Sequence, residues 1–446
     1  DLHHADGIIR EAQERAARLY CADETHFLVN GSTVGILSAI AGVTNKGDQI
    51  LVARNCHKSV YHAIYMNELN PVYLYPRFDS ELQLNIEISA EDVRRALNRY
   101  PQIRAVMIVS PTYDGIVSDV AEIAKAAHEK GLPLIVDEAH GAHFGFHPYF
   151  PENANQKGAD IVIHSVHKTL PAFTQTALLH MNGNLVNREK VRRYLHMLQS
   201  SSPSYIFMAS LDACVDFVDG KCENAFELYV ERLQKFREEL EPLQHLQILR
   251  TEHYDISKVV ISTANANITS PELADRLRKE YHLEMEMCGP DYVTAITTVA
   301  DTDEGLDRLC RAFLEIDHER RRDTGDCGTA ASGFSGINGD NTGERDRGIV
   351  DNGMEKERGC GWPEIAMTIA QAMDSPGRSV PLDACEGMVS GEFIYIYPPG
   401  IPIVAPGEVL KPELVEMIRQ YKCKGLPVQG TADPEVEEVL TAAGAD

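Results

Sequence analysis

Short apolar runs alternate with amphipathic stretches between about residue 24 and residue 185. The β-branched runs predict strands at residues 49–53, 72–75, 105–110, 132–137, 160–164 and 176–181. Apolar residues at helical spacing predict helices between them, among others at residues 89–99 and 120–130. This alternation is typical of a mainly parallel α/β sheet covered on both faces. Because ligands bind beyond the carboxyl ends of such strands, the residues that follow them are the first candidates for a site.

The pattern changes beyond this region. Long helices are predicted at residues 190–199 and 209–241, the second as a bridge between domains. Strands at residues 246–249, 258–263 and 295–299, with helices at residues 271–280 and 303–322, predict a smaller α+β domain. Gly, Asp, Asn, Ser and Arg dominate residues 323–361, which indicates a flexible insertion. A helical stretch resumes at Trp362, followed by a strand at residues 392–397 and a helix at residues 412–422.

Chain length and these changes in pattern predict more than one domain. We expect a large cofactor domain at residues 1–241, a small α+β domain at 242–322, the insertion at 323–361 and the C-terminal part of the small domain at 362–446.

The chain of 446 residues carries 67 acidic and 42 basic side chains, a formal net charge of −25. This excess opposes binding to nucleic acid or to an anionic membrane. No run of about 18 apolar residues is present, which argues against a transmembrane helix. The ten cysteines include no CxxC pair and are typical of reduced thiols. We therefore expect a cytoplasmic protein with neither nucleic acid nor membrane as a partner.

Lys168 follows an apolar strand in the segment Ile163-His164-Ser165-Val166-His167-Lys168-Thr169. A single lysine is most often a solvated surface residue. Its position just past a buried strand, in a predicted loop with His and hydroxyl neighbours, favours a ligand site instead. A lysine whose pKa is lowered there can form an imine with an aldehyde cofactor.

Asp137 ends a second apolar strand and opens the segment Asp137-Glu138-Ala139-His140. An unpaired carboxylate at the end of a buried strand is costly, so Asp137 needs a cationic or protonated partner. The ring nitrogen of pyridoxal phosphate (PLP) is such a partner, and we count His140 among the catalytic candidates. The same four letters match a helicase box, but the GxxxxGK[ST] loop that should precede such a box is absent.

Ser32 and Thr33 lie in a run of small residues before a predicted helix at residues 36–41. Such a helix N-terminus offers N–H and hydroxyl groups to a phosphate, although ordinary helix caps look the same. His57 also follows a predicted strand and can stack on a flat cofactor. Taken alone, a structural role for His57 is the better interpretation.

Two histidine pairs leave metal binding open as a minor alternative. His140 and His143, like His164 and His167, are three residues apart. No carboxylate or thiolate completes a recognisable set of ligands in the sequence.

Five segments complete the chemical pattern. In chain order they are Arg54-Asn55-Cys56-His57-Lys58-Ser59, Ser110-Pro111-Thr112-Tyr113-Asp114-Gly115, Asp137-Glu138-Ala139-His140, Ser165-Val166-His167-Lys168 and Tyr397-Pro398-Pro399-Gly400-Ile401-Pro402. Together they resemble the Orn/Lys/Arg decarboxylase family, in the short form of Gram-positive bacteria. The resemblance runs from the first residues to about Lys411, interrupted by the insertion. It implies a PLP enzyme of fold type I, the aspartate-aminotransferase fold, with active sites shared in a homodimer or higher even oligomer.

The resemblance also implies roles for single residues. Lys168 holds PLP as a Schiff base, and Asp137 pairs with the ring nitrogen. The remaining implied contacts are His57 and Ala139 on the two ring faces, Ser32, Thr33 and Ser165 on the phosphate, His167 on phosphate or substrate, Ser202 reaching the neighbour's phosphate, and Glu392 and Tyr397 at the entrance.

The implied reaction is decarboxylation of arginine, lysine or ornithine, with arginine slightly preferred. An aminotransferase of the same fold stays open; Arg378 is available for a substrate carboxylate, but no motif around it supports that role. A non-catalytic regulatory homologue is a third reading, and the retained Lys168 and Asp137 argue against it. Family members usually carry a segment with a Pro-Gly-His-Lys run before the Asp1-Leu2-His3-His4 stretch, so the resemblance implies lower activity without it.

Overall fold

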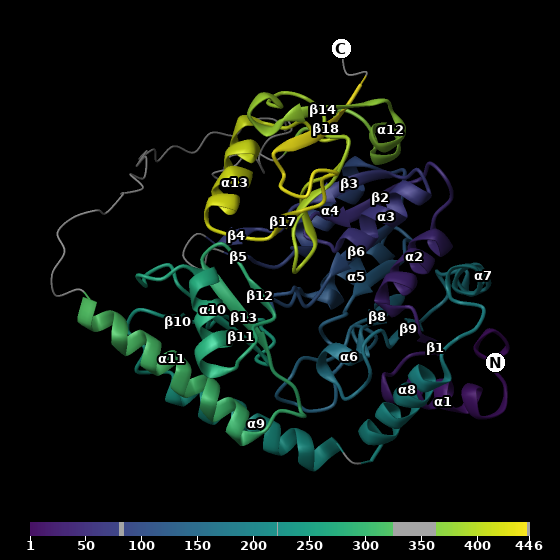
Figure 1. Ribbon diagram of the computed structural model, residues 1–446. Helices are drawn as coiled ribbons and strands as arrows, with labels where there is room; N and C mark the ends of the chain where they lie inside the picture. The colour runs from purple at the N-terminus through teal and green to yellow at the C-terminus, as the bar shows by residue number, and fades with distance from the viewer. Residues whose placement is uncertain (80–83, 221, 324–362, 444–446) are drawn as a thin grey trace, which may run out of the picture.

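The computed structural model describes residues 1–79, 84–220, 222–323 and 363–443 (Figure 1). A seven-stranded sheet forms its centre, with the strand order β1-β9-β8-β7-β6-β2-β3. The strands are β1 (Glu24–Leu28), β2 (Gln49–Ala53), β3 (Asn70–Leu74), β6 (Ile103–Val109), β7 (Leu134–Asp137), β8 (Ile161–His164) and β9 (Ala177–Met181). The six strands that the sequence predicts in this region are confirmed, with ends shifted by up to two residues.

The pairing of β9 differs from the predicted parallel pattern. β3, β2, β6, β7 and β8 pair in parallel, whereas β9 is antiparallel to both β8 and β1. The segment between β8 and β9 contains only the one-turn helix α6 (Val166–Thr169). A parallel connection needs a crossover that spans the sheet, usually a full helix, and this segment does not provide one. The sheet is therefore mainly parallel, as expected.

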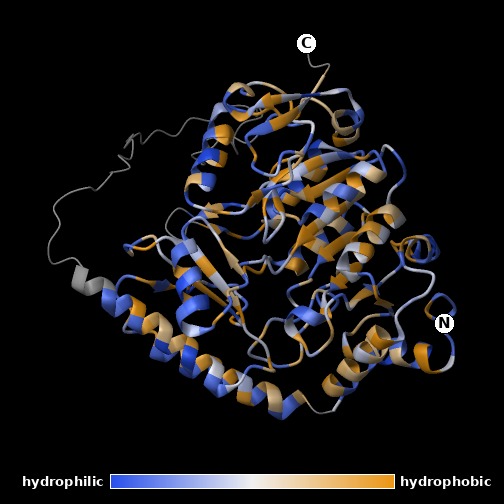
Figure 2. Ribbon diagram, in the orientation of Figure 1, coloured by the Kyte–Doolittle hydropathy of each residue, from blue (hydrophilic) through white to orange (hydrophobic). Residues whose placement is uncertain are grey.

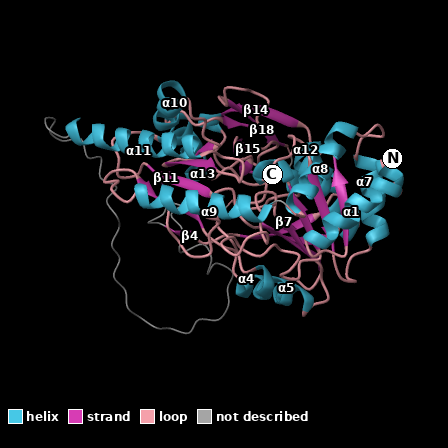
Figure 3. Cartoon of the chain, turned by 90° about the horizontal axis from the view of Figure 1, so that it is seen from below, coloured by secondary structure: helices cyan, strands magenta, loops and turns pink. Residues whose placement is uncertain are grey.

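Helices cover both faces of the central sheet. On one face α2 (Gly31–Val43) packs on β8 and β9 and contacts α3 (Lys58–Met66) and α7 (Arg188–Leu198). On the other face α4 (Ala90–Arg99) and α5 (Val120–His128) contact each other, β3 and β7, and lie together in Figure 3. Every residue of β7, β8 and β9 is buried, and the sheet is coloured as hydrophobic in Figure 2. This burial explains the continuous apolar runs of the sequence.

The predicted single helix at residues 209–241 is wrong. The structure has α8 (Tyr205–Val218) and α9 (Cys222–Glu239), with Asp219 as the C-cap of α8 and Gly220 after it. Glycine is a poor helix former, and this one separates two stretches of apolar periodicity. The first helical elements, η1 (Leu2–His4) and α1 (Gly7–Leu19), precede β1, and α1 packs on α8.

A second, antiparallel sheet has the order β10-β11-β13-β12. Its strands are β10 (Gln247–Ile248), β11 (Lys258–Ser262), β12 (Met287–Cys288) and β13 (Tyr292–Ile296), and its helices are α10 (Ser270–Tyr281) and α11 (Asp303–Asp323). The strand predicted at residues 295–299 begins earlier and ends at Ile296. Thr297 still donates its N–H to the carbonyl of Ser257, the residue opposite it in the register, and its hydroxyl donates to the same carbonyl. Helices α9 and α11 run side by side (Figure 3).

The described C-terminal region, residues 363–443, adds small sheets, two α-helices and one 3-10 helix. Its elements are α12 (Ile369–Asp374), β14 (Gly377–Pro381), η2 (Leu382–Ala384), β15 (Ile394–Ile396), β16 (Ile401–Val404), α13 (Pro412–Cys423), β17 (Val428–Gln429) and β18 (Glu438–Ala442). The helix expected from Trp362 starts only at Ile369, where Thr368 and Gln371 form a capping box that defines its first turn. The short antiparallel strand pair β4 (Phe78–Asp79) and β5 (Leu84–Asn85) completes the described fold.

The predicted insertion at residues 323–361 lies almost wholly outside the described residues. The apolar residues form separate clusters for the central sheet, for the β10–β13 sheet and for the C-terminal region. The proposed domain boundaries stay a prediction. Within the described ranges, no helix combines the length and apolar character needed to cross a membrane.

Candidate active site

Lys168 lies at the carboxyl edge of the central sheet, where the sequence predicts a ligand site. It belongs to the one-turn helix α6 and not to a loop, a correction that leaves its place after β8 unchanged. Its Nζ is 2.8 Å from His140 Nε2. The Tyr113 ring lies 5.0 Å from the same Nζ and 4.2 Å from the His140 ring, measured between centroids. Three segments that follow β6, β7 and β8 therefore meet at one amine.

Burial changes the acid–base properties of this group. It lowers the pKa of Lys168, and Asp137 and Glu286 only partly oppose the effect. Burial, with Lys168 and Lys258 nearby, also places the pKa of His140 well below its usual range. A neutral imidazole beside an amine of lowered pKa can exchange a proton with it.

Asp137 is the last residue of β7 and is almost completely buried. Its Oδ1 accepts a hydrogen bond from the Ala139 N–H at 3.1 Å. Burial raises the pKa of this carboxyl to about 6, although Lys168 acts in the opposite direction. As the sequence suggests, the carboxylate lies where a cationic partner would stabilise its charge.

Two of the residues predicted to bind the phosphate, Ser32 and Thr33, lie at the start of α2. Helix α2 begins at Gly31, earlier than predicted, so Ser32 and Thr33 belong to its first turn; Asn30 does not cap it through its side chain. The Gly31 N–H donates to the Gln175 carbonyl at 2.9 Å. Thr176 follows Gln175 in the chain, and its carbonyl oxygen lies 2.8 Å from His167 Nδ1. Residues 175 and 176 thus connect the N-terminus of α2 with the Lys168 segment.

Ser165 and His57 complete the predicted cofactor contacts. Ser165 is buried, and its Oγ has no hydrogen-bond partner in the described structure. His57 caps α3, with its Nδ1 2.8 Å from Ser59 Oγ. Burial lowers the pKa of His57 to about 4, with Lys168 and Lys58 acting in the same direction. His57 is therefore neutral and suited to stacking on a flat ring.

The C-terminal region closes over His57 through a buried ion pair. Arg54 Nη2 lies 2.9 Å from Glu408 Oε2, and Arg54 Nη1 donates to the Pro402 carbonyl at 2.6 Å. The Lys58 N–H donates to the Gly400 carbonyl at 3.0 Å. This ion pair holds the Tyr397–Pro402 segment beside the start of α3.

The contacts of the remaining predicted residues, Ser202, Glu392 and Tyr397, are with parts of the chain other than Lys168. Ser202 is exposed, and the segment before it hydrogen-bonds to Asn30 of the same chain through the Ser200 N–H. Glu392 uses both carboxylate oxygens to accept from the Leu440 and Ala432 N–H groups at 2.7 Å each. The bond to Leu440 attaches Glu392 to β18. Tyr397 is exposed, with Lys58 Nζ 5.0 Å from its ring centroid.

The histidines of the alternative metal site take part in other contacts. His164 Nε2 lies 2.7 Å from Glu138 Oε2, and His143 Nε2 lies 3.2 Å from Asp255 Oδ1. Among the described residues, no three His, Cys, Asp or Glu side chains converge in a way suited to a metal ion.

Two important contacts were not predicted from the sequence. Tyr113 OH donates to Glu286 Oε1 at 3.0 Å, and Lys258 Nζ donates to Asp255 Oδ2 at 3.1 Å. Tyr113 follows β6, a position that could have marked it. Glu286, Lys258 and Asp255 come from the second sheet and its loops, where no local pattern pointed to this site.

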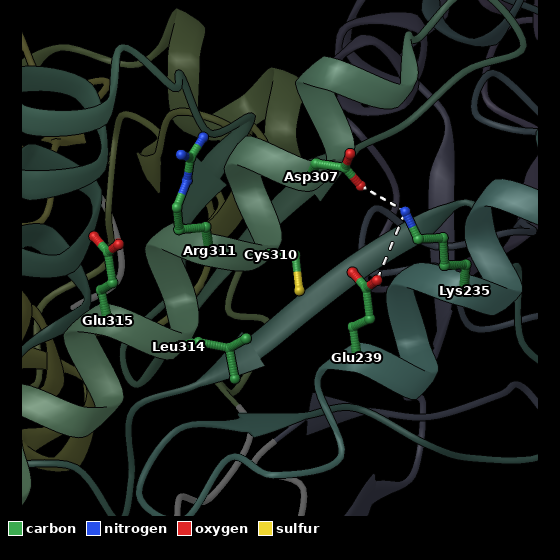
Figure 4. Close-up of a pocket in the computed structure, with 7 residues that line it drawn as sticks. All are labelled: Lys235, Glu239, Asp307, Cys310, Arg311, Leu314 and Glu315. Atoms are coloured by element: carbon green, nitrogen blue, oxygen red, sulfur yellow. Dashed lines mark hydrogen bonds and ion pairs between the residues drawn. The ribbon is translucent and has the colours of Figure 1, made fainter.

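A surface pocket between α9 and α11 is not part of this site. Figure 4 shows its lining, with the exposed Lys235 paired to Asp307 at 3.0 Å and to Glu239 at 3.6 Å. None of the site residues predicted from the sequence lines this pocket.

Comparison with known proteins assigns the family. The model "Orn/Lys/Arg decarboxylase, major domain" matches residues 1–271, and the model of the family's C-terminal domain matches residues 355–423. The chain belongs to the Orn/Lys/Arg decarboxylase family. The arginine decarboxylase of Bacillus subtilis (strain 168) is 32% identical over 441 residues, covering 97% of this chain and 85% of the relative.

Solved structures agree on the fold. The constitutive lysine decarboxylase of E. coli has a TM-score of 0.78 at 20% identity and covers 99% of this chain and 73% of its own. A structure of SPT with PLP has a TM-score of 0.56 at 16% identity, over 70% of this chain and 77% of its own. The fold type predicted from the sequence is thus confirmed.

Proposed function

We propose that this member of the family decarboxylates a basic L-amino acid, preferably L-arginine, with PLP held by Lys168. The observation that carries the proposal is the contact of Lys168 Nζ with His140 Nε2 at 2.8 Å, next to the strand that Asp137 ends. Arginine is preferred because the arginine decarboxylase of Bacillus subtilis matches nearly the whole chain.

The residues present fit PLP. The buried Ser165 Oγ, which has no partner among the described residues, and the uncapped first turn of α2 suit a phosphate. Asp137, whose pKa burial raises to about 6, suits a protonated ring nitrogen. His57 and Ala139 would pack against the two ring faces, and His167 would face the phosphate or the substrate.

When bound, PLP accepts the electron pair left by departing carbon dioxide. The chain's own residues do the rest. Lys168 holds the cofactor through Nζ, and its lowered pKa makes the neutral amine available nearer to neutral pH. His140 Nε2 takes a proton from Lys168 Nζ and returns it, so that the pair can protonate the substrate Cα. Asp137 keeps the proton on the ring nitrogen.

An aminotransferase of the same fold finds less support. Such an enzyme needs an arginine for the substrate carboxylate. Arg378, the candidate from the sequence, is exposed on β14, whose partner strand is β18 at the C-terminal end.

An exposed apolar patch supports a homodimer in which Ser202 reaches the partner's site. The patch consists of Ile8, Phe173, Met197, Tyr205 and Ile206. Its members lie on α1, α7 and α8 and, for Phe173, in the loop between α6 and β9; α1 and α8 are in contact, and Ser202 lies just before α8. Apolar side chains that together form one surface would mark an interface between subunits.

The test uses the full chain with added PLP. We expect an absorbance band of the lysine-bound cofactor that Lys168→Ala abolishes and Lys130→Ala, at an exposed position, retains. We also expect carbon dioxide release from L-arginine without a keto acid. Dependence on a keto acid would favour the aminotransferase, and the absence of the band would favour a regulatory homologue.

A further inference from the structure

Gln175 has a strained backbone conformation beside the proposed phosphate site. Its φ is +85°, in the left-handed region that residues with a side chain rarely adopt. The residue is exposed, so packing of its side chain in the core does not offset this strain. Strain of this kind persists only where the surrounding structure holds it, and it is common at functional sites.

Two hydrogen bonds of Gln175 hold the residues on either side of the N-cap of α2. The Gln175 carbonyl accepts from the Gly31 N–H at 2.9 Å, and the Gln175 side-chain amide donates to the Val29 carbonyl at 2.8 Å. Asn30, the N-cap, lies between these two residues. The conformation of Gln175 therefore helps to set the direction in which α2 begins.

The N-terminus of α2 also lacks the usual side-chain cap. An asparagine at this position commonly accepts a hydrogen bond from the first turn of its helix. The Asn30 side chain accepts instead from the Ser200 N–H at 3.1 Å and makes no capping bond to α2. The first N–H groups of a helix have no partner within it, so those of Ser32 and Thr33 can bind an anion.

We propose that Gln175 is a positioning residue that holds the first turn of α2 in the orientation that binds the cofactor phosphate. The inference rests on the proposed function, which places the phosphate of PLP at this turn. Gln175 acts through its bonds to Gly31 and Val29. The side-chain bond to Val29 keeps the strained backbone in place, and that backbone directs its carbonyl toward the Gly31 N–H.

A merely structural role for Gln175 makes a different prediction. If the residue only stabilises the loop before β9, its substitution lowers the free energy of unfolding and weakens the binding of every cofactor analogue alike. If Gln175 positions the phosphate site, the loss of affinity is confined to ligands that carry a phosphate.

The experiment compares PLP with pyridoxal, which has the same ring and aldehyde but no phosphate. Absorbance titration of the full chain, freed of cofactor, gives an affinity for each ligand, and reaction with Lys168 cancels in their ratio. Gln175→Met removes the side-chain donor without adding charge, and should lower the PLP-to-pyridoxal affinity ratio by about five- to tenfold. Gln175→Gly should lower it by only about two- to threefold, because glycine adopts a positive φ without strain.

Gln234→Met is the matched control, because it makes the same change at an exposed position of α9. It should preserve the ratio, and retained pyridoxal binding shows that each variant is folded. An unchanged ratio in Gln175→Met, or a loss in Gln175→Gly as large as that in Gln175→Met, would overturn the proposal. Carbon dioxide release from L-arginine is measured separately: a ratio that depends on Gln175 in a chain that releases none would refute the proposed reaction and leave this inference standing.

Discussion

At the scale of single residues, Lys258 connects the second sheet to the reactive site. It is fully buried at the start of β11, and its Nζ donates to Asp255 Oδ2 at 3.1 Å and to the His140 carbonyl at 3.4 Å. Burial raises the pKa of Asp255, but Lys258 and His143 outweigh this and hold it well below its usual range. Lys258 is therefore a positioning residue for the segment that carries His140.

We expect Lys258→Met to reduce the free energy of unfolding by about 3–5 kcal/mol, because Asp255 loses its main cationic partner while remaining buried. Urea unfolding measures the change. Since the folded-state pKa of Asp255 lies below its unfolded value, its stabilising contribution is present above pH about 4 and lost as the pH falls further.

Lys235→Met is the control for this prediction. Lys235 pairs with Asp307 at 3.0 Å on the exposed face of α9 (Figure 4), where an ion pair is worth about 0–1 kcal/mol. Equal losses of unfolding free energy in the two variants would show that the buried Lys258–Asp255 pair contributes no more to stability than an exposed ion pair.

At the scale of elements, α2 owes its close packing to two glycines. A Cβ on Gly42 would come within 2.4 Å of Val191 Cγ2 on α7, and one on Gly35 within 2.8 Å of Leu28 Cδ1 on β1. Glycine is a poor helix former, so these two positions lower the intrinsic stability of α2. Their missing side chains allow α2 to lie close to its neighbours. That approach places the first turn of α2 beside residues 175 and 176.

We expect Gly42→Ala to lower the free energy of unfolding by about 1–3 kcal/mol, because overpacking outweighs the gain in helix propensity. Gly305→Ala in α11 should instead stabilise the protein by about 0.5–1 kcal/mol, since the nearest atom to its Cβ is Thr302 Oγ1 at 3.5 Å. Chemical denaturation compares the two. A stabilising Gly42→Ala would contradict the tight packing of α2 on α7.

At the scale of the whole molecule, the apolar patch proposed as the interface lies next to the segment of Ser202. Ile206 and Tyr205 are each 67% exposed at the start of α8, directly after the segment of Ser202. The Ser200 N–H bonds to Asn30, the N-cap of α2. An interface formed by the patch would therefore lie beside the proposed phosphate site.

We expect Ile206→Glu to produce a monomer with weakened PLP retention, because a charge in the interface would be desolvated. Sedimentation measures the mass, and absorbance after gel filtration measures the retained cofactor. Leu228→Glu, on α9 with 42% exposure, should change neither. A dimeric Ile206→Glu would show that the patch is not the interface.

The sequence by itself determined the central sheet and the residues that follow its strands. Buried strands need continuous apolar runs, and those runs are visible locally. Lys168 and Asp137 were predicted because each comes just after or at the end of such a run, and both lie at the carboxyl edge. The division between α8 and α9 was missed because apolar periodicity continues on both sides of Gly220.

Only the tertiary structure decided which distant residues meet. The direction of β9 depends on a connection that forms only the one-turn helix α6 and no covering crossover, which strand patterns do not reveal. Glu286 meets Tyr113, Lys258 meets His140, and Glu408 meets Arg54 across separate elements. Each of these contacts depends on packing between surfaces far apart in the chain, and the energy of a buried charge is set by neighbours that no local pattern specifies.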